Sequence, residues 1–130
     1  MNPKWLAIVA LAGAAACASP TAPDPVGAWG GTQASLVLTA AGGTLSYACG
    51  AGTIDSTWTV SSSGAFLATG QHYFGGGPVP PGGGTPHPAI YRGDVGGNAF
   101  TFTVALTDSN QTLGPFAMVR GGPPVRETCL

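Results

Sequence analysis

The stretch Phe100-Thr-Phe102-Thr-Val104-Ala-Leu106 decides the fold class of this chain. Large apolar residues alternate in it with threonine and alanine, so every second side chain is apolar. Successive side chains of a β-strand point to opposite faces, and a period of two is therefore typical of a strand with one buried face. The pattern predicts a half-buried strand over 98–107.

The same period of two recurs along the chain from Gly31 onward, between segments rich in glycine and serine that are typical of turns. The pattern predicts seven strands, near 32–40, 43–49, 53–60, 65–74, 89–95, 98–107 and 112–120. A short eighth strand that ends at Cys129 would complete the set. We expect an all-β antiparallel meander of seven to eight strands that closes into a small barrel, because closure removes exposed strand edges. A β-sandwich is the alternative.

One connection differs from the short turns. The segment 75–88 contains six glycines and five prolines. We expect it to stay outside any central strand, since proline removes a hydrogen-bond donor from the ladder. It is interpreted either as a low-complexity loop or as a lid or partner-binding segment.

The first 16 residues are typical of a secretory signal peptide. Lys4 supplies the positive charge, an apolar run follows, and small residues precede Cys17. The apolar run is too short to span a bilayer. Small residues before a cysteine resemble the lipobox of bacterial lipoproteins, which implies that Cys17 is lipid-modified and that 17–26 form a tether to one domain at 27–130. Because Ala14 stands where the lipobox has leucine, ordinary secretion as a soluble periplasmic or external protein is the alternative.

The cysteine count agrees with export. Of the three cysteines, Cys17 is consumed by acylation or lost by cleavage, which leaves Cys49 and Cys129. Two remaining cysteines in an oxidising compartment most simply form a disulfide bond. A metal-binding or catalytic pair is the alternative, but Cys49 has no histidine or acidic neighbour in the sequence.

Composition and charge exclude several classes of function. Only 7% of the residues are charged, so the chain has no basic patch for nucleic acid. His72 and His87 are the only histidines and amount to half a zinc site, and each is expected to be satisfied or exposed. Asp55, Asp94 and Asp108 are not forced together by their spacing. We therefore expect no metal, no cofactor and no catalytic residues; a hydrolase that uses Asp55 or His72 is the remaining enzyme hypothesis.

Gly27-Ala-Trp29 ahead of an antiparallel meander resembles the start of lipocalin-like barrels. The resemblance implies that Trp29 plugs one barrel end and that the interior holds an apolar ligand. The downstream acidic and arginine motifs of lipocalins are not found in this sequence. The inward set that could line a ligand site is Trp29, Tyr47, Trp58, Phe100 and Phe102; the same residues could merely fill the barrel.

Two further resemblances concern the mature chain. The pattern of Trp-Gly-Gly at 29–31, Leu-Val-Leu-Thr at 36–39, Tyr-x-Cys-x-x-Gly-Thr-Ile-Asp at 47–55, Leu-Gly-Pro-Phe at 113–116 and a terminal cysteine resembles an uncharacterised family of small secreted or lipid-anchored bacterial proteins. A Tyr-x-Cys strand with a C-terminal cysteine is also similar to bacterial inhibitors of c-type lysozyme, in which a Ser-Gly loop enters the lysozyme cleft. Ser63-Gly64 is the matching candidate here.

These observations favour a bacterial envelope lipoprotein without enzymatic activity. It would be anchored to the membrane through Cys17 and would bind a small apolar ligand or an envelope protein. A protein-interaction or hydrolase-inhibitor lipoprotein is the alternative function.

Overall fold

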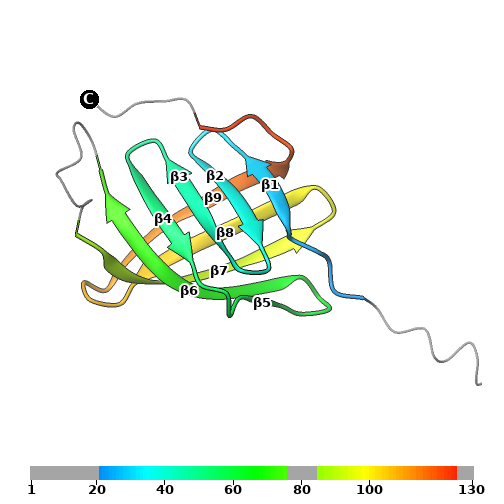
Figure 1. Ribbon diagram of the computed structural model, residues 1–130, viewed down its shortest axis with the longest axis horizontal. Helices are drawn as coiled ribbons and strands as arrows, with labels where there is room; N and C mark the ends of the chain where they lie inside the picture. The colour runs from blue at the N-terminus through cyan, green and yellow to red at the C-terminus, as the bar shows by residue number, and fades with distance from the viewer. Residues whose placement is uncertain (1–20, 76–84, 126–130) are drawn as a thin grey trace, which may run out of the picture.

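The computed structural model describes residues 21–75 and 85–125 as one all-β domain without a helix (Figure 1). The leader 1–16, Cys17 and Cys129 lie outside the described residues. The strands are β1 (Gly27–Gly30), β2 (Ala34–Thr39), β3 (Gly42–Tyr47), β4 (Gly50–Ile54), β5 (Thr59–Val60), β6 (Ala65–Phe74), β7 (His87–Gly96), β8 (Ala99–Leu106) and β9 (Gln111–Arg120). No helix in this part of the chain is long and apolar enough to cross a membrane.

The strands form a closed antiparallel barrel, which confirms the predicted fold class and rules out the sandwich. Each strand pairs with its neighbour in sequence, except that β4 passes over β5 and pairs with β6. The first and last strands close the ring, through Trp29 opposite Arg120 and Gly30 opposite Val119. Eight strands make the ring, while β5 pairs only with the beginning of β6.

The alternation predicted over 98–107 is confirmed in β8. Phe100, Phe102, Val104 and Leu106 are buried, and the residues between them are exposed or partly exposed. The same rule holds in β6, where every second residue from Phe66 to His72 is buried. The interior is therefore built from the apolar alternate positions of the strands.

Three details differ from the sequence-based prediction. The strand predicted at 53–60 is split into β4 and β5, and the eighth strand of the ring is β1, at the opposite chain end from Cys129. His87 and Pro88 belong to β7, between β6 and β8, so the expectation that all of 75–88 avoids a central strand is wrong. Pro88 is the second residue of its strand, and the beginning of a strand is where proline is tolerated.

Trp29 is buried in the core at one end of the barrel, which we call the plugged end. Its side chain is 1% exposed, its ring packs edge-on against Phe100 at 5.2 Å, and its indole N–H donates to the Pro25 carbonyl at 2.8 Å. The guanidinium of Arg120 lies 4.3 Å from the centre of the ring. Such a cation over an indole face stabilises both groups.

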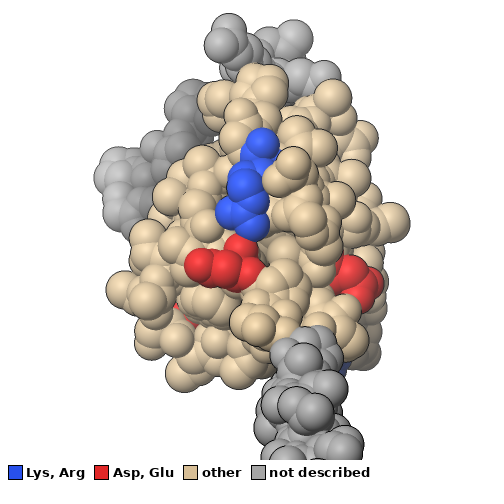
Figure 2. Space-filling model, turned by 90° about the vertical axis from the view of Figure 1, so that its right-hand side faces the viewer, with Lys and Arg blue, Asp and Glu red and all other residues tan. Residues whose placement is uncertain are grey.

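Arg120 also attaches the segment that leads into the barrel. Its guanidinium donates to the carbonyl oxygens of Val26 at 3.1 Å and Asp24 at 2.7 Å. Of the segment 17–26 expected as a tether, residues 24–26 thus contact the barrel. Figure 2 shows a basic patch beside an acidic patch, and another acidic patch apart from them, on a face that is otherwise uncharged, in line with the low charged fraction of the chain.

Candidate functional site

The five residues expected to line a ligand site belong to one hydrophobic core or pack against it, and they occupy different regions of that core. Trp29 and Phe100 pack at the plugged end, and Trp58 stacks on Phe66 at 6.1 Å. Phe102 lies between this end and Tyr47, with ring distances of 6.1 Å to Phe100 and 6.5 Å to Tyr47. The rings at the plugged end pack against one another and fill that part of the barrel. Tyr47 packs against other residues.

Tyr47 belongs to a second group of rings, which we call the Tyr47–His72 cluster. It comprises Tyr47 at the end of β3, His72 on β6, Tyr91 on β7, Phe102 on β8 and Phe116 on β9. The Tyr47 ring centre lies 5.2 Å from that of His72 and 5.1 Å from that of Phe116. Five strands of the ring therefore contribute one aromatic side chain each to the same interior region.

Two polar atoms of this cluster are buried without a hydrogen-bond partner, namely Tyr47 Oη and His72 Nδ1. His72 is only 3% exposed. The third polar side chain is satisfied, because the Tyr91 hydroxyl donates to the Gln71 carbonyl at 2.9 Å. A buried polar atom without a partner costs roughly 1–3 kcal/mol, and the two atoms are thus the feature of the interior that packing does not explain.

The side chains of the cluster are uncharged at neutral pH. Burial lowers the pKa of His72, and the nearby His87 lowers it further. Burial raises the pKa of Tyr47, and the neighbouring Tyr91 acts in the same direction. Burial is also the main cause of the raised pKa of Tyr91. The cluster therefore presents a neutral phenol and a neutral imidazole to anything that reaches it.

Phe74 and His87 form the rim of the cluster. The Phe74 ring is 50% exposed and lies edge-on to His72, with 4.7 Å between the ring centres. The other neighbour of Phe74 is His87, at 5.3 Å. His87 in turn is held by Asp108, with 2.8 Å between Nδ1 and Oδ2. Phe74 thus covers buried His72 on the solvent side. It packs against His87, whose position is held by the contact with Asp108.

Tyr91 was missed as a candidate site residue, and His72 was considered only for a hydrolase or as half a zinc site. The expectation that each histidine is satisfied or exposed does not hold for His72, whose Nδ1 is buried and unpartnered. The signal was present in the sequence, because His72 follows Phe66 by an even number of positions on one strand and so shares its inward face. Likewise, Asp108 contacts His87 although the sequence places the two far apart.

The structure does not bring together the groups that an enzyme hypothesis would need. Asp55 accepts a hydrogen bond from the Thr69 hydroxyl at 3.1 Å on the outside, whereas His72 lies inside the barrel. Within the described residues, no three His, Cys, Asp or Glu side chains gather closely enough to hold a metal ion. Ser63-Gly64 lies in the turn before β6, where the Gly64 carbonyl accepts from the Val95 N–H at 2.8 Å.

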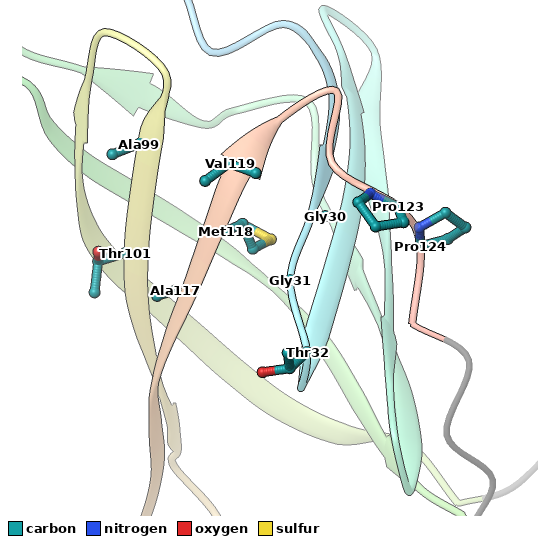
Figure 3. A pocket seen from close by; sticks show the side chains of 10 residues that line it. All are labelled: Gly30, Gly31, Thr32, Ala99, Thr101, Ala117, Met118, Val119, Pro123 and Pro124. Carbon is teal, nitrogen blue, oxygen red and sulfur yellow. The ribbon is translucent and has the colours of Figure 1, made fainter.

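A groove of about 850 Å³ lies on the outer side of the barrel (Figure 3). Its lining combines outward residues of β8 and β9 and the buried Met118 with the end of β1 and the segment that follows β9: Gly30, Gly31, Thr32, Ala99, Thr101, Ala117, Met118, Val119, Pro123 and Pro124. None of these residues is charged. Val119 is 53% exposed in it, so the groove presents an apolar surface to solvent.

The predicted disulfide partner Cys129 lies outside the described residues, and the Cys49–Cys129 bond stays a prediction. The described chain ends with Val125 beside β2. Val125 N lies 3.5 Å from Ser35 Oγ, and Ser35 pairs with Ser46, three residues before Cys49. Four residues lead from Val125 to Cys129, a segment that spans up to about 14 Å when extended.

Comparisons of the chain with protein-family models, with curated proteins and with solved structures find no match. The candidate site is therefore defined by its own geometry: a small closed barrel, plugged by Trp29 at one end and carrying two unpartnered polar atoms among aromatic rings in its interior.

Proposed function

We propose that this protein is a non-enzymatic binding module of the bacterial cell envelope, which takes a small, mainly apolar ligand at the Tyr47–His72 cluster. The observation that carries the proposal is the pair of unpartnered polar atoms, Tyr47 Oη and His72 Nδ1, within an aromatic interior. Ligand sites are typically apolar cavities with a few placed polar groups that fix the orientation of the ligand. A ligand that hydrogen-bonds these two atoms would remove the cost of leaving them unpaired.

The cluster suits binding better than it suits pure packing. At the plugged end, the one polar ring atom of Trp29 has its partner in the Pro25 carbonyl. At the Tyr47–His72 cluster, the aromatic packing is similar but the polar atoms are unsatisfied. An interior selected for stability alone would carry phenylalanine at these positions, since a phenol without a partner contributes no hydrogen bond.

Replacement of Tyr47 by phenylalanine tests the proposal. We expect a small molecule to remain bound to the protein purified from its own host, and native mass spectrometry measures it. Tyr47→Phe should weaken its affinity about tenfold, because one net hydrogen bond contributes about 1–1.5 kcal/mol. Without the ligand the variant should be at least as stable as the wild type. Tyr73→Phe is the matched control. Tyr73 follows His72 on β6 and points to the opposite face of the strand, so this variant should leave the affinity unchanged.

If no small molecule is bound to the wild type, and none can be loaded from a lipid extract of the host, the cluster is only a filled core. Equal loss of affinity in Tyr47→Phe and Tyr73→Phe would also contradict the proposal.

A partner protein of the envelope is the second candidate, and the groove beside Val119 favours it. The groove is uncharged and apolar, and such patches often mark protein contacts. An interaction or hydrolase-inhibitor lipoprotein would use this outer surface rather than the interior. Crosslinking of the protein in its own envelope distinguishes the two candidates, since Val119→Asp should remove a partner held in the groove and leave ligand binding at Tyr47 unchanged.

The envelope location rests on the leader and on Cys17. We expect a palmitate analogue to label the wild type in growing cells and to give no label on Cys17→Ala, because the lipid is attached to that thiol. The protein should then be found in the membrane fraction. A wild type without label, found in the soluble exported fraction, would establish ordinary secretion after Ala16.

A further inference from the structure

The unpartnered atoms of the Tyr47–His72 cluster also define the chemistry of what binds there. This inference rests on the proposed function, because it requires that a ligand enters the cluster. We propose that the ligand is an uncharged ring compound that carries a hydroxyl group, a phenol or a ring alcohol, with that hydroxyl placed between Tyr47 Oη and His72 Nδ1.

The hydrogen-bonding capacity of the two atoms selects a hydroxyl group. The Tyr47 hydroxyl both donates and accepts. His72 Nδ1 accepts in one tautomer of the neutral imidazole and donates in the other. A hydroxyl group also donates and accepts through a single oxygen, and it therefore satisfies both atoms in either tautomer. The centres of the two rings lie 5.2 Å apart in an edge-on contact, so the two side chains belong to the same region of the interior.

The charges around the cluster disfavour anionic ligands such as fatty acids. Of the described arginines, Arg120 is stacked on Trp29 at the plugged end, and Arg92 is exposed on the outer face of β7. The carboxylate at the rim, Asp108, would repel an anion. An ionised carboxylate buried without a cation is strongly unfavourable, and no described side chain of the cluster supplies one.

The apolar part of the site favours a flat ring. The neighbours of Tyr47 are aromatic and lie tilted or edge-on at centre distances from 5.1 to 6.5 Å: His72, Phe102 and Phe116. Aromatic rings prefer such offset and edge-to-face arrangements, and an added ring would continue them. Phe74 is the residue that the ligand would displace, because it is half exposed and covers His72.

Three probes of one shape test the inference: 2-naphthol, naphthalene and 2-naphthoate. Their affinities for the full chain are measured by isothermal titration at pH 7.5. We expect 2-naphthol to bind about tenfold more tightly than naphthalene, and 2-naphthoate to bind more weakly than both. The variant with Tyr47→Phe and His72→Phe keeps the aromatic packing but should bring 2-naphthol and naphthalene to equal affinity. Tyr73→Phe should retain the preference.

The outcomes separate the inference from the proposed function. Equal binding of naphthalene and 2-naphthol to the wild type would overturn the hydroxyl requirement and leave the proposed apolar site intact. Tighter binding of 2-naphthoate would overturn the exclusion of anions. Binding of none of the three probes would overturn both, and would indicate that trapped water alone satisfies Tyr47 and His72. A preference for 2-naphthol that persists in the double variant would place its site elsewhere and would also overturn the inference.

Discussion

Trp29→Ala is expected to lower the free energy of unfolding by about 3–5 kcal/mol, the usual cost of truncating a fully buried tryptophan. The side chain is 1% exposed and supports Phe100 from one side and Arg120 from the other. Its loss would open a void at the plugged end and remove the hydrogen bond to the Pro25 carbonyl. Because β1 and β9 pair at this position, the closure of the ring would weaken as well. Urea unfolding followed by far-UV circular dichroism measures the effect.

Trp58→Ala is the matched control for this prediction. Trp58 is also an aromatic residue with a satisfied indole N–H, which donates to the Thr39 carbonyl at 2.9 Å. It is only partly buried and stacks on Phe66 at the edge of the core. We expect a loss of about 1–2 kcal/mol, the range for a partly exposed contact. Equal losses in the two variants would contradict the role of Trp29 as the plug of the barrel.

The strands that the sequence predicted best are those whose pattern is local. The alternation over 98–107 placed Phe100 and Phe102 on the inward face correctly, and the strand at 65–74 matches β6 residue for residue. β1 could not be found in this way, because its four residues include two glycines and show no alternation. All four of its residues pair with β2, and Trp29 and Gly30 also pair with β9 at the other end of the domain. The pairing with β9 joins residues far apart in the sequence and leaves no trace in the local pattern.

The same distinction explains which site residues were predicted. Tyr47 and Phe102 were expected inside the barrel because each is a large aromatic residue at an alternate position. The contact of Arg120 with Trp29 could not be predicted, since it joins residues that only ring closure brings together. The unsatisfied state of His72 could not be predicted either, because a hydrogen-bond deficit depends on all the neighbours of an atom and not on the residue type.

Gly70→Val is expected to cost about 3 kcal/mol or more, because Gly70 lies where the ring closes between β4 and β6. Gly70 pairs with Ile54, the last residue of β4, and with Ala89 on the other side. A Cβ atom at this position would overlap the Thr53 carbonyl oxygen and lie 2.8 Å from its carbon and 3.1 Å from Ile54 Cα. These are backbone atoms, so relief requires the two strands to separate. Thermal unfolding of the variant measures the cost.

Gly96→Ala provides the comparison, because a Cβ atom there would meet no atom within 4 Å. Its stability should stay within about 0.5 kcal/mol of the wild type. A larger side chain at Gly70 disturbs the pairing of β4 with β6, in which Trp29 takes no part. Trp29 should therefore stay buried in any Gly70→Val protein that remains folded. A Gly70→Val protein as stable as Gly96→Ala would mean that β4 and β6 can move apart without loss, and that the barrel is closed by its other pairings alone.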